Sequence, residues 1–129
     1  MPFVWSQILI ILCIAYNVGF ALFHLCFWRL FRWPKTLMPS GELNSAVTQT
    51  LNVMLTYVFL AYAAGLLTAM LSKPETLHPL AIAGALFWLL RLVLQPWLFP
   101  SSRVSRIVTL IFALGVVLHA GVWLASYRS

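Results

Sequence analysis

Polar side chains that could bind a ligand recur at helical spacing inside the apolar runs of this 129-residue chain. Gln49 and Asn52 are three residues apart, and Arg91 and Gln95 are four apart, so each pair shares one face of a helix. His24 lies in a first run that has no charge before residue 29. Amide and imidazole groups orient ligands by hydrogen bonds, and a guanidinium binds anionic groups. We therefore predict one polar layer of ligand-binding residues, made of His24, Gln49, Asn52, Arg91 and Gln95.

Arg91 leaves two interpretations open, because it is the only charged residue well inside an apolar run. A charge at the centre of a bilayer costs about 2.5–3.5 kcal/mol on insertion scales. No Asp or Glu lies in these runs to pair with it. Arg91 could extend to lipid phosphate while the amides link helices to one another. Alternatively, it could face a pocket that holds an anionic group, and an Arg91→Leu variant with unchanged fold and lipid binding would exclude that pocket.

Sequence patterns of catalysis and metal binding are absent. The chain has no glycine-rich phosphate loop and no HExxH zinc motif. The apolar runs contain no carboxylate for general acid–base chemistry. His78 could approach His119, but two histidines alone make a weak metal site. His24 and His119 are expected at different depths, which disfavours a shared haem. We expect no catalytic residue, no metal site and no cofactor.

The composition indicates that lipid is the solvent for much of this chain. Hydrophobic residues make up 63% of it and charged residues only 8%, against about 25% charged in a soluble domain. A membrane-spanning helix needs about 20 apolar residues. The sequence predicts an all-α integral membrane protein with a single domain, residues 1–129, and helices over about 3–31, 44–71, 79–97 and 103–127.

Short loops between the four predicted helices favour antiparallel neighbours and hence an up-down-up-down four-helix bundle. Most of the basic residues fall at one end of these helices, at Arg29, Arg32, Lys35, Arg103 and Arg106. Basic loops face the cytoplasm, so both termini are expected on the non-cytoplasmic side. These five side chains are predicted to contact lipid headgroups. The net charge of +6 is explained in this way, and no nucleic-acid partner is expected.

Three segments carry a resemblance to known proteins. They are FHLCFWRLFRWP, LNSAVTQTLNVMLTYVF and ALFWLLRLVLQ, and the matching residues are His24, Trp28, Trp33, Asn44, Gln49, Asn52, Arg91 and Gln95. The segments cover most of the first three predicted helices and resemble small four-helix bacterial inner-membrane proteins of uncharacterised function. The resemblance implies a bacterial inner-membrane location and supports the polar layer, and it implies no activity.

The predicted function is binding or transport of an amphiphile or an anionic small molecule at the polar layer, which is expected in the cytoplasmic half of the bundle. An accessory subunit of a larger membrane complex is the alternative, since partner side chains could fill the same layer. The third hypothesis is a membrane-embedded enzyme with His24 as base and Arg91 binding charge, but it lacks a second catalytic group. The predicted partners are membrane lipids and either a second copy or a larger complex. Small residues four apart, at Ala61/Gly65 and Ala81/Ala85, allow close approach of helices.

Overall fold

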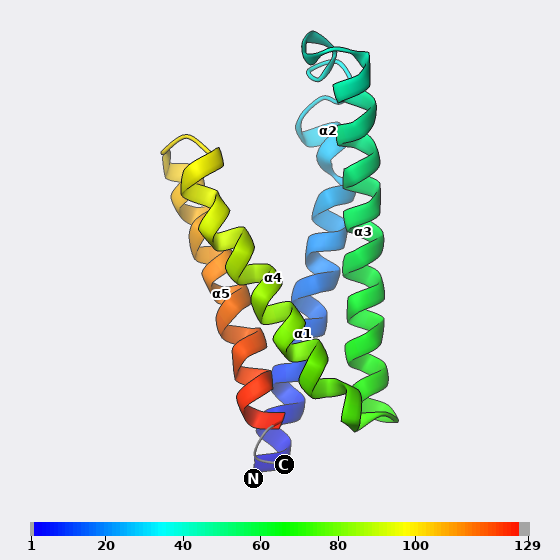
Figure 1. Ribbon diagram of the computed structural model, residues 1–129, viewed down its shortest axis with the longest axis vertical. Helices are drawn as coiled ribbons and strands as arrows, with labels where there is room; N and C mark the ends of the chain where they lie inside the picture. The colour runs from blue at the N-terminus through cyan, green and yellow to red at the C-terminus, as the bar shows by residue number, and fades with distance from the viewer. Residues whose placement is uncertain (1, 127–129) are drawn as a thin grey trace. The chain divides into compact units, whose positions relative to one another are not determined.

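The computed structural model describes residues 2–126, which form helices joined by short turns and loops, with no strand among them. The α-helices are α1 (Pro2–Leu25), α2 (Phe27–Leu30), α3 (Glu42–Leu71), α4 (Leu77–Leu98) and α5 (Arg103–Ser126) (Figure 1). Two 3₁₀ turns, η1 (Met38–Ser40) and η2 (Pro74–Thr76), precede α3 and α4. The prediction of an all-α fold is confirmed over the described part of the chain.

Four helical segments are long and apolar enough to cross a membrane: Val4–Leu25, Glu42–Leu71, Pro74–Leu98 and Arg103–Ser126. Even α4, with 22 residues, extends over about 33 Å at 1.5 Å per residue, which exceeds a hydrocarbon core of about 30 Å. The prediction of four helices long and apolar enough to cross a membrane is therefore confirmed among residues 2–126.

The first predicted helix, over 3–31, is wrong as a single element. Cys26 separates α1 from the four-residue α2, so the long helix ends six residues early. After α2, Arg32 takes a left-handed conformation with φ 55°, and the Trp33 amide donates to the Trp28 carbonyl at 3.0 Å. A left-handed residue of this kind ends a helix by redirecting the chain.

The other helices differ from prediction by one or two residues at their ends. The second, predicted over 44–71, begins after Gly41, whose φ of 96° is a glycine conformation. The third, predicted over 79–97, begins at Leu77 and continues through Pro96, because a proline near the last turn removes only one helical hydrogen bond. The fourth, predicted over 103–127, matches α5 over 103–126, and residue 127 lies outside the described residues.

Contacts within the chain divide it into two compact units. Unit 1 consists of Met1–Ile14 and Gly65–Ser129, and it includes α4, α5 and the end of α3. Unit 2 is Ala15–Ala64, which holds the second half of α1, α2 and most of α3. A single domain over residues 1–129 stays a prediction.

Within unit 2, α1 and α2 pack against α3 in antiparallel order. The Phe20 and Phe59 rings lie 5.7 Å apart, His24 bonds Asn52, and Trp28 of α2 bonds Gln49. The residue number rises from 20 to 28 on α1 and α2 while that of its partner on α3 falls from 59 to 49. This order is that of an antiparallel hairpin.

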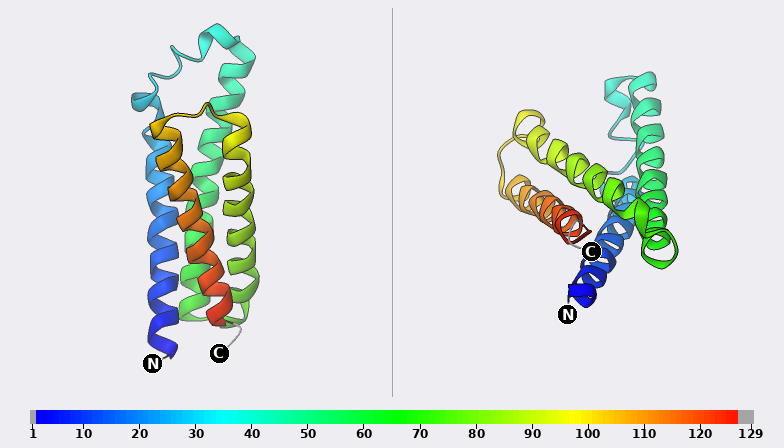
Figure 2. Two further views of the ribbon diagram at one scale, coloured as in Figure 1. Left: turned by 90° about the vertical axis from the view of Figure 1, so that its left-hand side faces the viewer. Right: turned by 60° about the horizontal axis from the view of Figure 1, so that its bottom comes forward.

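Within unit 1, α4 and α5 also run side by side in opposite directions (Figures 1 and 2). Gln95 bonds Ser105 at one end of the pair, and His78 contacts Ser126 at the other. Between them, the buried Trp88 ring stacks on Phe112 with centroids 5.9 Å apart and planes at 24°. This hairpin positions every side chain that α4 contributes to the candidate site.

Each long helix also keeps an apolar stripe outside the protein core. On α5, Leu110 and Val117 are 70% and 67% exposed, and on α4 Leu86 and Leu90 are 58% and 60% exposed. Residues three, four and seven apart share a helix face, so these side chains form continuous stripes. Large exposed apolar surfaces are rare on soluble monomers, and lipid is the medium in which they carry no cost.

Candidate functional site

In unit 2, Asn52 and His24 form a two-bond clamp between α3 and α1. The Asn52 side chain is only 4% exposed. Its Oδ1 accepts from His24 Nδ1 at 2.6 Å, and its Nδ2 donates to the His24 carbonyl at 2.8 Å. Because a carbonyl oxygen only accepts, this arrangement assigns the imidazole proton to Nδ1. The His24 carbonyl lies in the last turn of α1, where carbonyls lack helical donors, so Asn52 also caps that end.

A second link in unit 2 joins α2 to α3. The Trp28 indole donates to Gln49 Oε1 at 2.9 Å, and Gln49 Nε2 donates to Ser45 Oγ at 3.2 Å and to the Ser45 carbonyl at 3.3 Å. Both polar atoms of Gln49 are therefore bonded to the protein itself. This is the hydrogen-bonding pattern of residues that hold membrane helices together.

Aromatic rings surround the His24 imidazole. It stacks on Phe27 with centroids 4.6 Å apart and lies 5.4 Å from Phe59. The half-buried ring is thus engaged by Asn52 and packed between neighbouring side chains of its own hairpin. These contacts suit a structural histidine better than a catalytic base.

In unit 1, the Arg91 guanidinium lies against two aromatic rings. Its Cζ is 4.3 Å from the centroid of Phe112 on α5 and 4.8 Å from that of Phe99. Phe99 is the residue that follows the last residue of α4, so the Arg91 side chain extends toward that end of the helix. Cation–π contacts contribute about 0.5–1 kcal/mol when exposed and about 2 or more when desolvated. The two rings therefore offset part of the cost of placing Arg91 in an apolar helix.

Arg91 and Gln95 each retain one buried polar atom without a hydrogen-bond partner. Gln95 is 2% exposed, and its Nε2 donates to Ser105 Oγ at 3.1 Å, but its Oε1 accepts no bond. Arg91 Nη1 is likewise buried and donates no bond. A buried polar atom left unpaired costs about 1–3 kcal/mol. Four residues apart on α4, the two side chains present one unused donor and one unused acceptor on a single helix face.

The five predicted site residues are divided between the units. His24, Gln49 and Asn52 belong to unit 2, and Arg91 and Gln95 belong to unit 1. The structure joins His24 to Asn52 and Gln49 to Trp28, whereas Arg91 and Gln95 share a face of α4. A single layer made of all five remains a prediction.

The structure adds Phe99, Ser105 and Phe112 to the surroundings of Arg91 and Gln95, and sequence reasoning missed all three. A signal was available. A short antiparallel hairpin centred near residue 100 places residue 95 opposite 105, and residues near 90 opposite those near 110. Applying that register would have placed Ser105 and Phe112 beside the polar pair.

The predicted headgroup contacts, Arg29, Arg32, Lys35, Arg103 and Arg106, are all exposed at helix ends or in loops. Their contact with lipid stays a prediction. Among residues 2–126, no group of three or more His, Cys, Asp or Glu side chains could hold a metal ion.

Comparisons of the chain with protein-family models, with curated proteins and with solved structures found no match.

Proposed function

We propose that this chain is an integral membrane protein that binds an anionic amphiphile at the Arg91–Gln95 end of the α4–α5 hairpin. In this proposal the four spans alternate in direction, the basic helix ends face the cytoplasm, and both termini lie outside it. The lengths of the four apolar helices and the exposed stripes of α4 and α5 support membrane insertion. The proposal includes a bacterial inner-membrane location, which is supported by the three segments that resemble proteins of that membrane.

The observation that carries the binding proposal is the pair of buried, unpaired atoms, Arg91 Nη1 and Gln95 Oε1. An anionic oxygen would accept from Nη1, and charge-assisted bonds of this kind are the stronger ones. A hydroxyl or ammonium group on the same ligand would donate to Oε1. Headgroups such as phosphatidylglycerol and phosphatidylethanolamine carry both functions, a phosphate acceptor and a donor.

The surroundings of the pair fit an amphiphile rather than a water-soluble anion. Phe99 and Phe112 enclose the guanidinium with apolar surface, and the outer stripes of both helices would face acyl chains. A lipid reaches such a site laterally within its own leaflet. The amides of unit 2 are bonded internally, so in this proposal they stabilise the fold and do not contact the ligand.

Native mass spectrometry of the purified full chain, titrated with phosphatidylglycerol, tests the proposal. Arg91→Leu should weaken binding about 10-fold or more, because a hydrogen bond to a charged group contributes about 1.5–3 kcal/mol. Arg91→Lys keeps the charge without the fork of donors and should be intermediate. Arg106→Leu is the control. It removes one positive charge from an exposed position on α5, at the same end of the α4–α5 hairpin, and so measures the non-specific attraction of the headgroup.

Equal phosphatidylglycerol binding by wild type and Arg91→Leu would refute the site. Purification from native membranes separates the alternative function. A stoichiometric protein partner that is released by Arg91→Leu would show that a partner side chain, and not a lipid, fills the site, as expected for an accessory subunit.

A further inference from the structure

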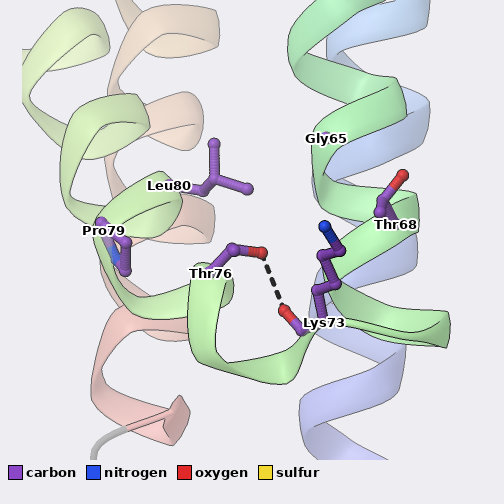
Figure 3. A pocket seen from close by; sticks show the side chains of 6 residues that line it. All are labelled: Gly65, Thr68, Lys73, Thr76, Pro79 and Leu80. Atoms are coloured by element: carbon purple, nitrogen blue, oxygen red, sulfur yellow. Dashed lines mark hydrogen bonds between the residues drawn. The ribbon is translucent and has the colours of Figure 1, made fainter.

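The turn between α3 and α4 borders a groove of about 480 Å³ that is separate from the Arg91–Gln95 pair. It is lined by Gly65, Thr68, Lys73, Thr76, Pro79 and Leu80 (Figure 3). All six residues belong to unit 1. The volume falls within the range of about 300–1,000 Å³ that is typical of small-molecule sites. Figure 3 shows the Lys73 amine directed into the space between Leu80 of α4 and Thr68 of α3.

Lys73 is the group in this groove that can bind an anion. Its ammonium carries three donors, and the side chain is exposed. The Thr76 hydroxyl donates to the Lys73 carbonyl at 2.8 Å, so its proton is not available to a ligand. Glu75, the carboxylate of the same turn, does not line the groove. The groove therefore offers one positive charge without a lining carboxylate to oppose it.

The lining changes from polar to apolar along the groove. Lys73 lies between the two candidate membrane spans, and Thr76 lies in the 3₁₀ turn η2 at the start of the second span. Gly65 and Leu80 lie within the helices α3 and α4 themselves. A Cβ atom added at Gly65 would be 3.6 and 3.7 Å from the two Leu80 methyl groups, so a methyl group fits there in ordinary van der Waals contact. The missing side chain of Gly65 thus leaves an apolar floor beneath a basic rim.

We propose that this groove binds an anionic phospholipid, with its phosphate at Lys73 and the first part of an acyl chain over Gly65 and Leu80. A phosphate ion alone would contact the rim but could not use the apolar floor, whereas a phospholipid matches both. The inference rests on the membrane insertion proposed above and is independent of the Arg91–Gln95 site.

The test is native mass spectrometry of the full chain with phosphatidylglycerol and, separately, phosphatidylcholine. Lys73→Gln should weaken phosphatidylglycerol binding about fivefold, the effect of one basic residue at an anionic headgroup. Lys73→Arg should retain phosphatidylglycerol binding.

The Gly65 variants test the apolar floor. Gly65→Leu should weaken binding of both lipids because its side chain fills the floor. Gly65→Ala, which fits against Leu80, should preserve binding and shows that the helix tolerates a side chain there. Glu75→Gln alters a charge in the same turn but outside the groove and should have no effect.

Unchanged phosphatidylglycerol binding in both Lys73→Gln and Gly65→Leu would overturn the groove. A thermal shift with inorganic phosphate that is lost in Lys73→Gln would overturn the lipid assignment in favour of a free anion. The two sites can fail separately. If Arg91→Leu weakens phosphatidylglycerol binding and Lys73→Gln does not, only the groove is refuted. If Lys73→Gln weakens binding and Arg91→Leu does not, only the Arg91–Gln95 site is refuted. If the chain fails to insert into vesicles, membrane insertion fails and both assignments fail with it.

Discussion

Replacing Asn52 by Leu should lower the free energy of unfolding of the hairpin in unit 2 by about 1–3 kcal/mol. Asn52 makes two hydrogen bonds across the helix pair, at 2.6 and 2.8 Å, and both are lost in the variant. Hydrogen bonds between membrane helices average about 0.6 kcal/mol and reach about 1.7. Two bonds give the stated range, with the upper end favoured by the burial of Asn52, which is 4% exposed.

A double-mutant cycle isolates one of these two bonds. His24→Phe removes the Nδ1 donor but keeps an aromatic ring to stack on Phe27. The bond from Asn52 Nδ2 to the His24 carbonyl survives in that variant, so it cancels from the coupling energy. The coupling that remains is the Nδ1–Oδ1 bond, expected at about 0.6 kcal/mol and at most about 1.7. The assay is unfolding of the full chain in mixed micelles, followed by circular dichroism.

A coupling within about 0.3 kcal/mol of zero, the ordinary error of additivity, would refute the clamp as a link between helices. A matched control is Thr56→Val, introduced into the wild type and into His24→Phe. Thr56 bonds only the backbone of its own helix, at the Asn52 carbonyl, and should therefore show no coupling to His24.

Three further variants test individual contacts. Gln95→Met, measured in lipid-free detergent, should leave the free energy of unfolding unchanged or raise it by about 1 kcal/mol. The unpaired Oε1 costs about 1–3 kcal/mol, and the lost bond to Ser105 contributes about 0.5–1.5 kcal/mol. A clear loss of stability would mean that Oε1 has a partner. Trp28→Phe should cost about 0.6 kcal/mol more in the wild type than in a Gln49→Met background, because only the wild type loses the hydrogen bond to Gln49. Equal costs in the two backgrounds, measured by unfolding in micelles, would contradict that bond. Trp123→Phe removes the donor to His78 Nε2 at 3.2 Å, so nitrogen NMR should show a shift of that atom, and an unchanged His78 signal would contradict the contact.

The four long helices could be predicted because lipid imposes a simple requirement. A helix that crosses it must be apolar over about 20 residues, and the sequence contains four such runs. The break at Cys26 could not be predicted in this way, because Cys26 is neither glycine nor proline and its neighbours are apolar. The Asn52 side chain bonds the carbonyl exposed next to that break. Tertiary contact thus supports a helix end that local sequence does not indicate.

In the candidate site, residue spacing predicts which side chains share a helix face, whereas tertiary packing determines which of them find a hydrogen-bond partner. Helical periodicity correctly put Arg91 and Gln95 on one face of α4, since that depends only on residues per turn. Whether a polar atom finds a partner depends on how each helix is rotated. Gln49 faces Trp28 and is satisfied, whereas Gln95 meets Ser105 with its amide nitrogen only. No pattern of residue types distinguishes these two glutamines.

The unpaired Gln95 oxygen distinguishes a binding site from an arginine that merely extends to the membrane surface. Any phospholipid phosphate satisfies Arg91 Nη1, so an arginine that only reaches the surface would bind phosphatidylcholine and phosphatidylethanolamine equally well. Choline has no N–H or O–H, and would leave Oε1 unpaired. An ethanolamine or glycerol headgroup donates to it, which recovers the cost of about 1–3 kcal/mol and predicts a preference of about 5- to 150-fold over phosphatidylcholine. In Gln95→Met that preference should disappear while Arg91-dependent binding of phosphate remains, and a preference that survives the substitution would show that Gln95 does not read the headgroup.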